Sequence, residues 1–125
     1  RGPSRRRRRG AVAARALNMA SFADNLATLP NVAHIARLEL HDADGHCVAV
    51  IENRPGSAGS VAVYHAVTRP DGVLDRAAAE QALALYAEHT ADARAQPGKH
   101  PNIDRLFELI AADARLRVRV IAADE

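Results

Sequence analysis

Two segments of the chain alternate between hydrophobic and polar residues, the pattern of a β-strand with one buried face. The first, AHIARLELHDADGHCVAVIEN, alternates on both sides of Asp42-Ala43-Asp44-Gly45 and predicts a hairpin that turns there. The second, RLRVRVI, predicts a strand near the C-terminal end of the chain, with two alternating faces. Its hydrophobic face carries Leu116, Val118 and Val120, and its polar face carries Arg115, Arg117 and Arg119.

The hairpin pattern assigns each side chain to one of two faces. The face expected toward the core carries Ala36, Leu38, Leu40, Cys47, Ala49 and Ile51. The face expected toward solvent carries Ile35, Arg37, Glu39, His41, His46, Val48 and Val50. The agreement between the two strands is the clearest structural signal in the sequence.

Other segments have helical periodicity. A short helix is predicted from Ser21, its N-cap, to about Leu29, and a second over VAVYHAVTR, after a possible N-cap at Ser60. Asp75 is expected to cap a long helix that reaches about Gln96, and a last helix runs from Asn102 to Ala114. The predicted fold is therefore α+β: a small antiparallel or mixed three-stranded sheet, made of the hairpin and the C-terminal strand, with helices packed on one face.

The charge is distributed unevenly. Residues 1–18 contain seven arginines and no acidic residue, whereas the other 107 residues hold 10 Lys and Arg against 15 Asp and Glu, a net charge of −5. We predict that residues 1–18 are a disordered Arg-rich tail and that residues 19–125 form a single domain. The tail would lie upstream of a natural start at Met19, or serve as a basic arm for nucleic acid, or as a targeting segment.

Composition narrows the possible function classes. A single cysteine, Cys47, excludes an internal disulfide framework and indicates a reducing compartment, so we expect a cytoplasmic protein. No apolar run approaches the roughly 20 residues of a membrane span. The chain has no Trp, two Phe and two Tyr, which disfavours stacking on nucleic-acid bases, so nucleic acid is expected only at the Arg tail.

The segment YAEHTADARAQPGKHPNIDRL holds two histidines and several carboxylates, the residue types of a metal or acid–base site. On a continuous long helix, His89 falls inside the apolar arc, with Glu88 and Asp92 on its flank, and His100 follows in the Pro-Gly connection. These four residues are our candidate ligand-binding set, with a core or packing-seam role for His89 as the alternative. The two histidines match no standard zinc spacing, so the sequence does not decide whether a metal binds.

Three further motifs are weaker. His41 and His46 flank the hairpin turn as a possible metal pair, but DADG lacks the later ligands of a calcium loop and is interpreted as a turn. Cys47 is expected to face the core and to be inert. RPGSAGS could cradle an anion at a helix N-terminus, although it lacks the Lys and the spacing of a phosphate loop.

The outer face of the predicted sheet is a candidate interface. It combines β-branched residues with charges at the margin, a pattern that suits self-association or a protein partner. The alternative is an ordinary solvated face. The candidate residues are Ile35, Val48, Val50, Arg117 and Arg119.

Two motifs carry a family resemblance. In PGSAGSVAVYHAV and LYAEHTADARAQPGKHPNIDRL the chain resembles a family of small bacterial proteins, mainly proteobacterial, classed as a domain of unknown function. The resemblance covers about Ser21 to Ile121 and excludes the Arg tail. It implies a cytosolic bacterial protein and supplies no activity or catalytic residue.

We therefore expect a non-enzymatic cytosolic interaction or regulatory module, a possible homodimer, with no cofactor and no catalytic residue assigned. The alternative hypothesis is a small-ligand or metal-binding protein, or an enzyme, that uses His89 and His100. The sequence leaves open whether these two histidines approach each other.

Overall fold

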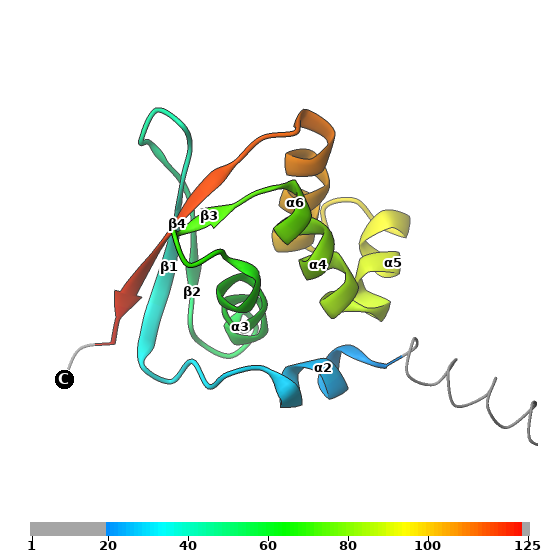
Figure 1. The fold of residues 1–125 in the computed structure, drawn as a ribbon. Coiled ribbons are helices and arrows are strands. Elements are labelled where there is room, and N and C mark those ends of the chain that lie inside the picture. The colour runs from blue at the N-terminus through cyan, green and yellow to red at the C-terminus, as the bar shows by residue number, and fades with distance from the viewer. Residues whose placement is uncertain (1–19, 124–125) are drawn as a thin grey trace, which may run out of the picture.

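The computed structural model describes residues 20–123. The Arg-rich segment 1–18 and the proposed start at Met19 lie outside the described residues. Four strands are labelled in Figure 1: β1 (Ile35–His41), β2 (Cys47–Glu52), β3 (Val73–Leu74) and β4 (Leu116–Ala122). The helices are α2 (Phe22–Thr28), α3 (Ala58–Val67), α4 (Arg76–Tyr86), α5 (Glu88–Ala95) and α6 (Pro101–Ala112).

The strands form an antiparallel sheet in the order β2-β1-β4-β3, and the α+β class is confirmed. The sheet has four strands rather than the three expected. The additional strand, β3, has two residues and follows the turn that ends at Gly72, whose φ of +87° suits glycine. The Gly72 carbonyl accepts a hydrogen bond from the Val118 N–H at 2.7 Å, which joins this turn to β4.

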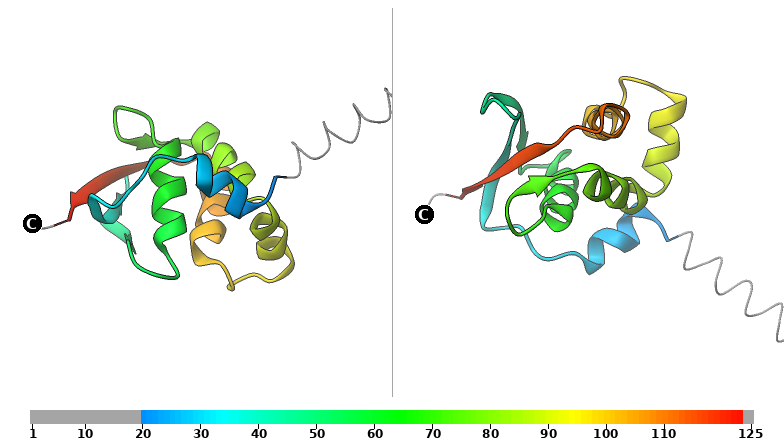
Figure 2. Two further views of the ribbon diagram at one scale, coloured as in Figure 1. Left: turned by 90° about the horizontal axis from the view of Figure 1, so that it is seen from below. Right: turned by 45° about the horizontal axis from the view of Figure 1, so that its top comes forward.

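The helices lie on one side of the sheet, as Figures 1 and 2 show. Leu38, Leu40 and Ile51 are buried on that side, as the hairpin pattern predicted. The helix predicted over VAVYHAVTR is confirmed as far as Val67, because α3 ends there, buries Val61, Val63, Tyr64 and Val67 and faces the sheet with no strand pairing. One hydrophobic core joins these residues to Ala82, Tyr86, Ile103 and Leu106 of the outer helices.

The helix expected from Asp75 to Gln96 is interrupted at Ala87, so that prediction is wrong. Asp75 does cap α4, by accepting the Ala78 N–H at 3.0 Å, but Ala87 has φ +54° and ends the helix. The Thr90 hydroxyl donates to the Leu83 carbonyl at 2.5 Å across the break. The chain resumes as α5 in a new direction, which places the α5 side chains differently from a continuous helix.

Irregular pairing at two points reverses two sequence predictions. The β1–β2 register shifts between Leu40 and His41, so that Cys47 pairs with His41 and is exposed rather than in the core. The β1–β4 register shifts between Ile35 and Arg37, and Ile35 is buried in the core with 2% of its surface exposed, rather than on the outer face. A bulge changes the strand face that follows it, which simple alternation cannot anticipate.

None of the helices in the described range is long and apolar enough to span a membrane.

Candidate functional site

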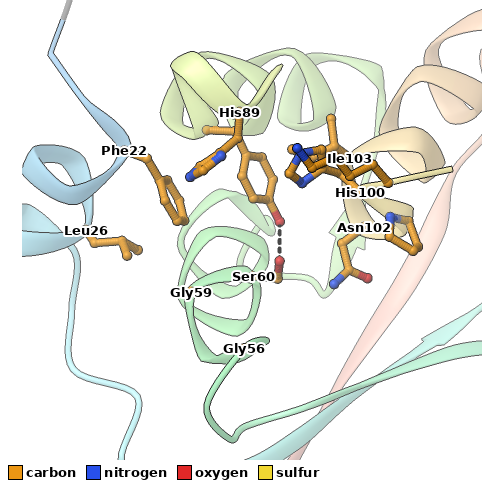
Figure 3. Close-up of a pocket in the computed structure, with 12 residues that line it drawn as sticks. Phe22, Leu26, Gly56, Gly59, Ser60, His89, His100, Asn102 and Ile103 are labelled. Atoms are coloured by element: carbon orange, nitrogen blue, oxygen red, sulfur yellow. Dashed lines mark hydrogen bonds between the residues drawn. The ribbon is translucent and has the colours of Figure 1, made fainter. Parts of the chain in front are cut away.

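A cavity of about 420 Å³ lies where α2, the start of α3, the α4–α5 junction and the start of α6 meet (Figure 3). Such a concave site with apolar walls and a few polar groups is the usual form of a small-ligand pocket. Its lining residues are Phe22, Leu26, Gly56, Gly59, Ser60, Tyr86, His89, Lys99, His100, Pro101, Asn102 and Ile103. We call this cavity the histidine pocket.

The structure brings His89 and His100 together, which answers the question that the sequence left open. Their ring centroids are 5.6 Å apart, and both rings line the histidine pocket. His89 is half-exposed and meets the Phe22 ring edge to face at 4.9 Å between centroids. His89 is therefore part of the pocket wall at a packing seam.

Asp92 lies behind the pocket lining and contacts the two residues at its polar end, His100 and Lys99. Its Oδ2 lies 2.7 Å from His100 Nε2 and 2.9 Å from Lys99 Nζ, and its Oδ1 accepts a hydrogen bond from the Gln96 side chain at 2.7 Å. Hydrogen bonds from His100 and then from Lys99 hold the pKa of Asp92 well below its usual range. Asp92 does not line the cavity, so its role is to orient His100 and Lys99.

Glu88 also lies outside the pocket lining. Its Oε1 accepts the backbone N–H of Phe22 at 2.8 Å, and this bond is the main reason why the pKa of Glu88 is lowered. Its other oxygen is 4.0 Å from His89 Nε2. Glu88 thus ties the first turn of α2 to the α4–α5 junction. Of the four predicted ligand residues, two line the pocket and two hold its walls.

The start of α2 is built as the sequence predicted. Ser21 caps the helix by accepting the Asp24 N–H at 3.1 Å, while its own N–H donates to the Asp24 carboxylate at 3.3 Å. The Asn25 side chain donates to the Leu85 carbonyl at 2.9 Å. These bonds fix Phe22 over the pocket. Sequence reasoning missed Phe22 as a wall residue because its docking partner is 66 residues away.

The first turn of α3 forms the opposite wall. The helix begins at Ala58, so the predicted N-cap role of Ser60 is wrong, and the N-cap position is Ser57. The Ser60 hydroxyl instead accepts a hydrogen bond from the Tyr86 hydroxyl at 2.6 Å, drawn in Figure 3. A Cβ on Gly59 would lie 3.0 Å from the Phe22 ring, so glycine allows this close approach.

Tyr64 anchors the start of α6 from below the pocket. Its hydroxyl donates to the Asn102 carbonyl at 2.5 Å and accepts from Arg105 Nη1 at 3.1 Å. Burial raises the pKa of Tyr64 to about 12, against the opposing effect of Arg105, and burial also raises the pKa of Tyr86. Both tyrosines are therefore neutral hydrogen-bond donors at ordinary pH.

Two features of the histidine pocket suit an anion. The first turns of α3 and α6 both border it, and the N-terminal end of a helix carries partial positive charge. Lys99 and the two histidines add nitrogen atoms to the lining, and none of the described residues that line the cavity is acidic, while Asp92 behind the lining contacts Lys99 and His100. The anion site that RPGSAGS suggested thus lies against the predicted histidines, with Gly56, Gly59 and Ser60 in the same wall.

The predicted interface residues do not share one surface. Val50, Arg117 and Arg119 lie on the uncovered side of the sheet, with Val50 46% exposed. Val48 is 52% exposed but borders a shallow hollow beside α6, lined also by Arg105 and Leu109. Ile35, as described above, is in the core.

The histidine pocket is not a metal centre of the kind that three close ligands form. The groups of three or more ligand-type side chains found within the described range both lie at the hairpin. They are Glu39, His41 and Cys47, and Asp42, Asp44 and His46.

Fold and site together define a small α+β protein with a histidine-lined pocket on the helical side of an antiparallel sheet. The chain belongs to a family described as "uncharacterized protein conserved in bacteria (DUF2322)", whose model matches residues 22–120. The predicted resemblance to a bacterial family of unknown function is confirmed. No curated protein and no solved structure matches the chain significantly. Both segments that carried the resemblance contribute walls of the histidine pocket.

Proposed function

We propose that the protein binds a small organic anion in the histidine pocket. A carboxylate or phosphate group would lie against His89, His100 and Lys99, and an apolar or aromatic portion would pack on Phe22 and Leu26. The observation that carries this proposal is the convergence of three nitrogen-bearing side chains in a cavity whose described lining residues include no acid. Charge-assisted hydrogen bonds to an anion are stronger than neutral ones.

The arrangement supports binding rather than catalysis. The Tyr86 hydroxyl is engaged with Ser60, and Asp92 is engaged with His100 and Lys99. These bonds fix the positions of the donors and leave no strong base exposed in the cavity. A preorganised set of donors lowers the cost of ordering on binding. The proposed role is therefore that of a ligand-binding or regulatory protein, and the single-cysteine composition supports a cytoplasmic location.

The test uses three probes of matched size or charge: phenyl phosphate, inorganic phosphate and benzyl alcohol. We expect isothermal titration calorimetry to show binding of phenyl phosphate, weaker binding of inorganic phosphate and none of benzyl alcohol. His89→Ala and His100→Ala should each weaken phenyl phosphate binding by about tenfold or more, since each removes an imidazole from the pocket wall.

The matched control is His46→Ala, because His46 is 77% exposed at the hairpin turn, away from the pocket residues. It should bind phenyl phosphate like the unaltered protein. Failure of phenyl phosphate to bind, or an equal loss in His46→Ala, would refute the proposal. Circular dichroism of each variant checks that it is folded.

Self-association is a second candidate function, favoured by the exposure of Val50 on a strand at the edge of the sheet. A second copy could pair with β2 and bury Val50, because an edge strand offers unpaired backbone groups. Light scattering should then show a dimer for the unaltered chain and a monomer for Val50→Glu. A monomer in both cases would rule this candidate out.

A further inference from the structure

The outer side of the sheet, opposite the side that holds the histidine pocket, carries a second cluster of side chains that can bind a ligand. The inference drawn from this cluster does not depend on the proposed function. Glu39 and His41 are two residues apart on β1 and therefore point to the same side. The register shift after Leu40 pairs His41 with Cys47 on β2. From this placement we propose that Glu39, His41 and Cys47 form a binding site for a zinc-type divalent metal ion.

The distances fit a shared ion. His41 Nε2 lies 3.2 Å from Glu39 Oε1. On a tetrahedral zinc ion, a ligand nitrogen and a ligand oxygen lie about 3.3 Å from each other, because each is about 2.0–2.2 Å from the metal. Each of the three side chains offers an atom within 4.8 Å of the other two. Cys47 Sγ, which donates to the Ala49 carbonyl at 3.5 Å, would leave that carbonyl and lie about 3.6 Å from the other two ligand atoms.

The surroundings orient the ligands. His41 Nδ1 lies 3.2 Å from the Gly45 carbonyl, so a proton on Nδ1 leaves the Nε2 lone pair directed at Glu39. Histidine ligands of metals usually donate their second N–H to a carbonyl or carboxylate in this way. The Nε2 lone pair and the Glu39 Oε1 lone pair would repel each other at this distance. A proton or a metal ion held between the two atoms makes the contact favourable. Arg37 lies 3.8 Å from the other Glu39 oxygen and steadies the carboxylate.

The donor set selects the kind of metal. One thiolate, one imidazole and one carboxylate suit Zn²⁺ or Co²⁺, whereas Mg²⁺ and Ca²⁺ prefer oxygen alone. Three protein ligands leave one position open, as in catalytic zinc sites. A second cavity of about 420 Å³ is lined by His41, Arg117 and Arg119, together with Asp42 and Asp71. The arginines oppose a bare cation, and they suit a metal that carries an anion at its open position.

The neighbouring turn cluster is a less suitable site. Asp42 Oδ1 already accepts the N–H groups of Asp44 and His46, both at 2.9 Å. The backbone hydrogen bond from His46 is the main cause of the lowered pKa of Asp42. These bonds are those of an Asx turn, which explains the cluster without a metal. His46 therefore serves as the control position.

The experiment is a titration of the reduced, metal-free full chain with Co²⁺. Binding at Cys47, the one cysteine of the chain, should produce a near-ultraviolet sulfur-to-cobalt charge-transfer band that saturates at one equivalent. His41→Ala and Glu39→Gln should weaken Co²⁺ affinity by more than about tenfold, Zn²⁺ should displace Co²⁺, and His46→Ala should bind normally. Binding should also release protons, because the thiol loses its proton.

Several outcomes would overturn the proposal. Absence of the band at millimolar Co²⁺ would do so, as would a band that His41→Ala leaves unchanged. If His46→Ala lost as much Co²⁺ affinity as His41→Ala, the metal would bind at the hairpin turn and not at the proposed site. The three positions lie on the sheet surface, and circular dichroism of each variant separates lost binding from lost folding. Phenyl phosphate binding in His41→Ala is expected to be normal, so the two sites are tested separately.

Discussion

At the scale of single residues, the histidine pocket depends on side chains that do not themselves line it. Asp92 contacts His100 and Lys99 at 2.7 and 2.9 Å and so places two donors at the polar end of the cavity. Glu88 fixes the backbone of Phe22. The sequence selected His89 and His100 as the main candidates, with Glu88 and Asp92 beside them, and did not select Lys99. Their division into lining and supporting residues follows from backbone geometry.

Asp92 makes stability sensitive to acid. Its pKa is lowered in the folded state, so its contribution is complete above the unfolded value of about 3.9 and is lost as the pH falls through the folded value. Asp92→Asn should lower the melting temperature at neutral pH, and the difference from the unaltered protein should shrink as the pH falls below about 4. Thermal unfolding from pH 2 to pH 7 measures this. A constant difference across that range would contradict the assignment.

At the scale of elements, breaks in regular structure decide what the sequence could predict. The short helix α2, the hairpin and the buried face of α3 follow from local patterns of capping and periodicity. The end of α4 at Ala87 does not, because no glycine or proline marks it and the bonds that stabilise it come from α2 and Thr90. No sequence signal marks the bulge after Leu40 either. Because of this bulge, Cys47 is exposed and does not face the core as predicted.

The tie between α3 and α6 is testable through Tyr64. Tyr64→Phe removes the hydroxyl that donates to the Asn102 carbonyl and accepts from Arg105, and leaves Arg105 with its other hydrogen bond, to the Asn102 side chain at 2.8 Å. We expect a loss of about 1–2 kcal/mol in the free energy of unfolding. This loss corresponds to a melting temperature lower by at least about 4 °C.

The comparison variant is Tyr86→Phe. Its lost hydrogen bond is to Ser60, which faces the histidine pocket and can be satisfied by solvent there. Chemical denaturation of both variants should show the larger loss for Tyr64→Phe. If Tyr64→Phe were as stable as the unaltered protein, the hydrogen bonds of the Tyr64 hydroxyl would contribute nothing to the free energy of unfolding.

At the scale of the whole molecule, the sheet separates two sites. The helical side holds the histidine pocket, where residues from α2, α3, α4, α5, the start of α6 and the connection before α6 meet. The opposite side holds the cluster of Glu39, His41 and Cys47. The fold class could be read from the sequence, and the sequence also selected His89 and His100, which line the same pocket. Their approach to Phe22 and Gly59 could not, because it results from long-range docking that no local pattern encodes.

Binding of a small organic anion in the histidine pocket can be tested residue by residue with a ¹H–¹⁵N NMR titration of the full chain with phenyl phosphate. We expect the largest shift changes at the amides of Gly56, Gly59, Ser60, His89 and Asn102, with saturation at one equivalent. Shift changes confined to the sheet side, at Arg117 and Arg119, or no changes at millimolar phenyl phosphate, would contradict it.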